Sequence, residues 1–162
     1  MVCGVIIRKG EKYYSYLRKL FSAMGDMQLN YKWLLSNYEC YPVDASIQKL
    51  LKAGYCILGG DQLTELVNTE DFQWIWGTFS AFDPSVDNAE ILQYPLPEND
   101  MCEDLWKAPL IMQHPLSKIE IVAFDSSSTL IFTRDFSLLE TLREVYPQAE
   151  DLETLNNDNS LW

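Results

Sequence analysis

The sequence predicts an α+β fold with a single domain, in which a mixed or mostly antiparallel sheet carries three to four helices. Apolar residues make up 48% of the 162-residue chain, enough for a core without disulfides or metals. Short β-branched or aromatic runs alternate with segments of helical spacing, and the last two strand candidates form a hairpin pattern. We expect the domain to span residues 1–147, followed by an acidic tail at 148–162.

The first part of the chain alternates between strand and helix patterns. A β-branched run at 2–8 predicts a strand, and apolar residues at helical spacing then predict a helix that ends at Gly25. Residues 29–35 predict the next strand. Asp44 is the expected N-cap of a second helix, which Gly54 ends.

The middle of the chain contains the longest strand candidate. A short strand at 55–58 and a brief helix capped by Asp61 precede it. In the run 72–82 apolar side chains occupy both faces, so we expect a central strand that is covered on each side. Trp74 and Trp76 are accordingly predicted to lie in the core.

Residues 83–117 differ in character from the rest of the chain. They contain five prolines, many acids and no periodic run, which predicts a long irregular connection. Connections of this length are uncommon in compact domains and are often functional or mobile. Within it, residues 103–106 predict one helical turn.

The last part predicts a hairpin, a helix and a tail. Strands at 119–124 and 129–133 flank a turn-rich joint, and Ser137 and Glu140 have the spacing of a capping box ahead of a final helix. The acidic tail is expected to be mobile. Three of its apolar residues are candidates for docking on the domain: Leu152, Leu155 and Trp162.

The net charge is −12 and is unevenly distributed. Residues 1–60 hold eight bases and four acids, whereas residues 61–162 hold four bases and twenty acids. This charge disfavours direct binding to nucleic acid and to anionic membranes. It favours a basic protein as partner.

The sequence predicts a cytoplasmic protein with free thiols. Its apolar stretches are too short to span a membrane, and the N-terminus lacks the pattern of a secretory signal. The four cysteines have no Cys-x-x-Cys spacing, which favours reduced thiols: Cys3, Cys40, Cys56 and Cys102.

No pattern indicates a catalytic residue, a cofactor or a metal site. His114 is the only histidine, so a His-based metal cluster is excluded, and a loop-anchoring or solvent-exposed role is favoured over that of a general base. Gly59-Gly60-Asp61 is typical of a strand-to-helix turn, because it lacks the further residues of a phosphate loop.

The residues that we expect to contact a partner lie in the 83–117 segment. Acids gathered there predict a charged surface, and the tryptophan among them is a candidate anchor, since Trp is enriched at binding hot spots. This candidate surface consists of Glu98, Asp100, Glu103, Asp104 and Trp106.

One stretch resembles a known family. Residues 119–127, Ile-Glu-Ile-Val-Ala-Phe-Asp-Ser-Ser, followed by Thr-Leu-Ile-Phe at 129–132, resemble an uncharacterised family of small proteins found largely in Gram-positive bacteria. The long Pro-rich segment and the acidic tail look unlike that family. The resemblance implies a bacterial cytoplasmic origin and supplies no catalytic residues.

The leading hypothesis is therefore a non-enzymatic, acidic protein-binding module, such as a bacterial immunity or regulatory protein that covers a basic partner. One alternative is a small enzyme with a pocket under residues 83–117. Another is a structural or regulatory subunit that self-associates through a sheet edge. The sequence leaves the oligomeric state open.

Overall fold

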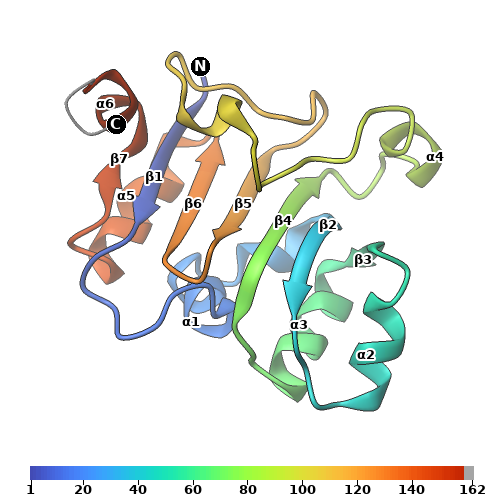
Figure 1. Cartoon of the computed structure of the whole chain (residues 1–162). Helices are drawn as coiled ribbons and strands as arrows, with labels where there is room; N and C mark the ends of the chain where they lie inside the picture. Colours follow the sequence, from blue (N-terminus) through green and yellow to red (C-terminus); the bar gives the residue numbers. More distant parts are fainter. Residues whose placement is uncertain (159–162) are drawn as a thin grey trace.

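The computed structural model describes residues 1–158, which are arranged around one seven-stranded sheet (Figure 1). The strands are β1 (Cys3–Ile7), β2 (Lys32–Cys40), β3 (Tyr55–Gly59), β4 (Trp74–Phe82), β5 (Ile119–Phe124), β6 (Ser128–Thr133) and β7 (Glu150–Asp151). The α-helices are α1 (Leu17–Ala23), α2 (Ala45–Leu51), α3 (Gly60–Thr69), α4 (Asn88–Ile91), α5 (Phe136–Val145) and α6 (Leu152–Asn157). Two 3-10 helices are η1 (Met27–Asn30) and η2 (Glu103–Trp106).

The strand order is β3-β2-β4-β5-β6-β1-β7, and each neighbouring pair of these strands is antiparallel. The predicted α+β class with a mostly antiparallel sheet is thereby confirmed. β4 and β5 lie in the middle of the order, and nearly all their residues are buried on both faces, apart from Ile75, Trp76 and Phe124, which are half-buried, as the apolar pattern of the longest strand predicted. The predicted hairpin is β5 and β6, paired from Ile119↔Thr133 to Phe124↔Ser128.

One face of the sheet, the helix-covered face, packs against α1, α2, α3 and α5 through a large apolar cluster. α5 is typical of these helices: Leu138, Leu139 and Leu142 repeat at helical spacing and are fully buried. The Asp44 carboxylate caps α2 by accepting hydrogen bonds from the backbone N–H groups of Ser46 and Ile47, as predicted. Apolar burial therefore positions these helices.

The other face, the segment-covered face, is shielded by residues 83–117, which we call the crossing segment, and by α6. Figure 1 shows the crossing segment, which connects β4 to β5, running from α4 beyond the end of β4 to the side of β5, β6 and β1. Two smaller apolar clusters lie beneath these elements. One contains Leu105, Leu110 and Leu152, and the other is built on Phe82 and Ile91.

The structure differs from the sequence prediction in several elements. Residues 1–158 contain six α-helices rather than three to four, because single turns form in the crossing segment and in the tail. β2 extends to Cys40, well beyond the predicted strand. α5 is capped by the Asp135 carboxylate, which accepts from the N–H of Ser137, so the predicted capping box at Ser137 and Glu140 is wrong.

Part of the predicted tail is docked on the domain. β7 pairs with β1, and the Glu150 carboxylate forms an ion pair with Arg8 at 2.7 Å. Leu152 and Leu155 of α6 are buried, whereas the third docking candidate, Trp162, lies outside the described residues. None of the helices in residues 1–158 has the length and apolar character needed to cross a membrane.

Candidate functional site

A buried carboxylate attaches the crossing segment to the sheet. Glu120 of β5 has no exposed surface, and its two oxygens accept hydrogen bonds from the backbone N–H groups of Gln113 (2.9 Å) and His114 (2.8 Å). The Ser117 hydroxyl donates a third at 2.8 Å. Burial raises the pKa of Glu120, and these hydrogen bonds oppose that rise. The carboxylate thus fixes the end of the segment on the sheet.

His114 is part of the same attachment. Its Nδ1 accepts from the N–H of Leu116 (3.2 Å), so its Nε2 carries the proton and donates to the carbonyl of Ile91 (3.0 Å). Its ring lies edge-on to the rings of Phe82 and Tyr94. Burial lowers the pKa of His114. The histidine joins two parts of the crossing segment, and both ring nitrogens are occupied.

Ser117, His114 and Glu120 are the residue types of a hydrolase triad, but they are not arranged as one. In such a triad the imidazole receives the proton of the serine hydroxyl. Here the single proton of the Ser117 hydroxyl is shared between the carbonyl of His114 (2.7 Å) and the Glu120 carboxylate (2.8 Å), while the imidazole bonds to backbone groups. All three side chains are buried, so a substrate has no access to them.

A second attachment lies at the middle of the crossing segment. The side chains of Ser36 and Asn37, both on β2, donate to the carbonyl of Pro97 at 2.8 Å each. The Gln113 side-chain amide accepts from the N–H of Glu98 and donates to its carbonyl, both at 2.8 Å. The long irregular connection is therefore ordered by polar contacts rather than by secondary structure.

Three aromatic side chains meet near one end of the segment-covered face. Trp76 of β4 and Phe124 of β5 have ring centroids 4.8 Å apart, and Trp106 of η2 lies 5.0 Å from Phe124. Both pairs are edge-to-face, which is a favourable geometry for aromatic rings. All three side chains are half-buried. We call this group the aromatic cluster.

The predicted contact residues lie on this side of the molecule. Glu98, Asp100, Glu103 and Asp104 are exposed, and Trp106 is half-buried within the aromatic cluster. Lys107 forms ion pairs with Glu103 (3.4 Å) and Asp104 (3.0 Å), which reduces their net negative charge. In residues 1–158, no ion pair involves Glu98 or Asp100.

The crossing segment combines acids with exposed apolar side chains. It carries seven acids and one lysine. Met101 is 91% exposed, between Asp100 and Glu103 in sequence. The other large apolar side chains that it leaves exposed are Leu92, Tyr94 and Ile111. A surface of this kind offers both charge and apolar area to a partner.

Sequence reasoning missed two members of the aromatic cluster. Trp76 was predicted to lie in the core, but the pairing of β2 with β4 is irregular between Ser36 and Cys40, and the indole remains half-buried. Phe124 ends its strand beside the turn. The only signal in the sequence was the place of Phe124 at the end of a strand beside a turn. This place does not show which strand lies next to it, and so it does not show the contact with Trp76.

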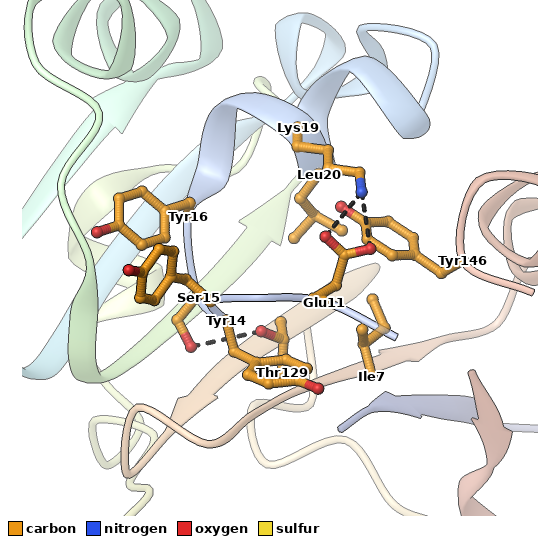
Figure 2. Close-up of a pocket in the computed structure, with 10 residues that line it drawn as sticks. Ile7, Glu11, Tyr14, Ser15, Tyr16, Lys19, Leu20, Thr129 and Tyr146 are labelled. Carbon is orange, nitrogen blue, oxygen red and sulfur yellow. Dashed lines mark hydrogen bonds and ion pairs between the residues drawn. The ribbon is translucent and has the colours of Figure 1, made fainter. Parts of the chain in front are cut away.

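The most enclosed hollow that we describe is small and lies elsewhere. It has a volume of about 40 Å³ and lies between the start of α1 and the end of α5, lined by several tyrosines (Figure 2). Lys19 pairs with Glu11 at 2.7 Å, and its ammonium lies 5.0 Å from the ring centroid of Tyr146. Ser15 contacts Thr129 at 3.4 Å. This volume suits one or two water molecules rather than a substrate.

A larger hollow of about 600 Å³ is open to solvent beside α2 and the end of β2. Cys40 lines it, and burial raises the pKa of this thiol to about 12. The pKa of Cys56 is raised to about 11 for the same reason. All four cysteines are free thiols, and these two are not activated as nucleophiles.

Within residues 1–158, no three His, Cys, Asp or Glu side chains are grouped to hold a metal ion.

Comparisons with known proteins add no assignment. No family model, no curated protein and no solved structure matches the chain. The resemblance of residues 119–132 to a bacterial family therefore stays a prediction. Any function must be argued from the geometry of the crossing segment and the aromatic cluster.

Proposed function

We propose that the chain is a non-enzymatic, acidic protein-binding module that covers a basic protein partner with its segment-covered face. The observation that carries the proposal is the crossing segment itself. It is ordered by buried polar contacts, yet it leaves acids and large apolar side chains exposed. A bacterial immunity or regulatory protein of the cytoplasm would have this role.

Charge supports a basic partner. The seven acids of the crossing segment give it a strong negative field, which accelerates the encounter with a cationic surface and disfavours acidic competitors. The helix-covered side carries charges of both signs: α5, for example, contains Glu140 and Glu144 together with Arg143. The expected contact therefore lies over the crossing segment.

The aromatic cluster supports a specific contact rather than a diffuse one. Exposed ion pairs alone contribute about 0–1 kcal/mol each, so charge needs an apolar anchor to give a stable complex. Trp106 is half-buried, and its indole is held edge-on against Phe124. A preordered indole loses little conformational entropy on binding. An arginine or lysine side chain of the partner could also stack on the face of the indole, where a cation–π interaction stabilises it.

The enzyme alternative has less support from the same region. The only histidine has both ring nitrogens bonded to the backbone, and the side chain of Glu120 has no exposed surface. A reactive centre under the crossing segment would need different groups. Binding of a protein partner needs only the acids and apolar side chains that the crossing segment already exposes.

The test is affinity capture of the tagged protein from its native cell extract at low and at high salt. We expect one basic partner in stoichiometric amount, retained at low salt and weakened at high salt, because exposed charges are screened beyond about 10 Å at 0.1 M salt. The double variant Glu98→Lys/Asp100→Lys should lose the partner.

A matched control is Glu140→Lys/Glu144→Lys, which changes the net charge by the same amount on α5, on the other face of the sheet. This variant should keep the partner. Equal loss in both doubles would mean that only net charge matters. Equal retention in both, or no partner at either salt concentration, would contradict the proposed surface.

A further inference from the structure

The two edges of the sheet differ, and we propose that the β3 edge pairs with the β3 edge of a second copy of this chain. The pairing is antiparallel, forms a twofold-symmetric dimer and joins the two sheets into one. This inference does not rest on the proposed binding function, because it concerns the edge of the sheet at β3 and not the acids and aromatic cluster of the segment-covered face.

The β3 edge has free backbone groups. In residues 1–158, β3 pairs only with β2. The N–H of Gly59 bonds to the Gln62 side chain at 2.8 Å rather than to β2. Since successive residues of an antiparallel strand alternate in direction, the N–H and C=O groups of Tyr55 and Ile57 also point outward. These groups are the hydrogen-bonding edge that a further strand would use.

Nothing in the side chains of β3 opposes pairing. The strand reads Tyr-Cys-Ile-Leu-Gly, without a charge or a proline, which are the features that usually block an edge. Tyr55 is exposed and Ile57 is half-buried, and Ile57 packs against the cluster of Phe82 and Ile91 on the segment-covered face. Side chains of a second strand would pack beside these two residues.

The opposite edge of the sheet is protected. β7 has only two residues, Glu150 and Asp151, and both are acidic. They are engaged by cations on the same chain: Arg8 and Lys9 with Glu150, and Arg143 with Asp151. Short length and charge make this edge a poor template for another strand.

Charge favours a second copy and an antiparallel register. Lys52 precedes β3, and Asp61 follows it in the first turn of α3; both side chains are exposed. In an antiparallel pair centred on Ile57, Tyr55 of one copy lies opposite Gly59 of the other. The N–H of Gly59 stays bonded to Gln62, so in this register the two copies are joined through the N–H and C=O groups of Ile57 and by the N–H of Tyr55 donating to the carbonyl of Gly59. The end of the strand that carries Lys52 then meets the end that carries Asp61, twice by symmetry.

The experiment is a measurement of mass in solution by sedimentation over a range of concentrations. The chain of 18.8 kDa should reach twice that mass as concentration rises. Ile57→Pro removes the outward N–H and should leave a monomer, because proline is tolerated on an edge strand but cannot donate there. Far-UV circular dichroism of the variant would show whether it keeps the secondary structure of the wild-type chain.

A charge swap tests the register without altering the strand. Lys52→Asp should weaken the dimer about tenfold by placing like charges together, and Lys52→Asp/Asp61→Lys should restore it. A wild-type chain that stays at 18.8 kDa at every concentration overturns the proposal. So does a dimer that is unchanged by Ile57→Pro and by Lys52→Asp, which would place the interface elsewhere.

Discussion

The two faces of the sheet are covered by different means. The helix-covered face is shielded by helices whose leucines repeat at helical spacing, as in α5. The segment-covered face is shielded by a chain with little regular structure, attached through Glu120, His114 and Ser36. The first arrangement makes a stable core. The second leaves exposed acids and half-buried aromatic rings on an ordered backbone, which is a suitable basis for recognition.

The largest effect is expected on the helix-covered face. Leu139→Ala removes a fully buried side chain from the main apolar cluster and should lower the free energy of unfolding by about 2–5 kcal/mol. Urea denaturation measures this change. Val145→Ala, on the exposed side of the same helix, is the control and should change it by about 0.5 kcal/mol or less. Similar losses in the two variants would contradict the assigned core.

The polar attachment should come next. Glu120→Gln places an amide N–H₂ where one oxygen now accepts from a backbone N–H, which leaves a buried donor without an acceptor. We expect a loss of about 2–4 kcal/mol and faster hydrogen exchange at Gln113 and His114. The exposed Glu140→Gln on α5 should change neither. If Glu120→Gln leaves exchange unchanged at both amides, the carboxylate does not hold the segment.

These two sites also show what the sequence could reveal. The four helices of the helix-covered face and the strands β1 to β6 were predictable because apolar side chains repeat at the period of the structure that buries them, whereas α4, β7 and α6 carry no such repeat. The role of Glu120 was not predictable, since a glutamate in the pattern Ile-Glu-Ile-Val looks like a solvent-facing residue of a half-exposed strand. Its three donors lie three to seven residues away, in a segment without periodicity.

The acidic contact residues were predictable for a simple reason: acids are almost always exposed, so the sequence alone locates the charge. The partners of Trp106 were not. Phe124 lies against this indole and against Trp76 only through the pairing of β4 with β5 and the path of the crossing segment.

A smaller loss of stability is expected when the middle of the crossing segment is released from its end. Gln113→Ala removes both hydrogen bonds to the backbone of Glu98 and should cost about 1–2 kcal/mol. The amide of Glu98 should exchange faster, while strands facing the helices keep their protection. The exposed Gln148→Ala is a control. Uniform acceleration of exchange across the chain would mean that the segment and the helices unfold together.

The smallest effect concerns His114. Because burial lowers its pKa in the folded chain, the unfolded chain binds a proton first as pH falls. The contribution of His114 to stability is therefore present above about pH 6.5 and is lost on acidification below it. As the only histidine, it can be followed by NMR without ambiguity. We expect a neutral ring with its proton on Nε2 and a pKa below 6.5. A normal titration near 6.5 would contradict the buried attachment.

The most direct test of the account is hydrogen exchange of the protein, measured free and bound to the basic partner recovered by affinity capture. We expect added protection in residues 98–106 and at the ends of β4 and β5 that carry the aromatic cluster, with α1, α3 and α5 unchanged. Protection confined to these helices would show that the partner binds the helix-covered side, and it would contradict the proposed function of the segment-covered face.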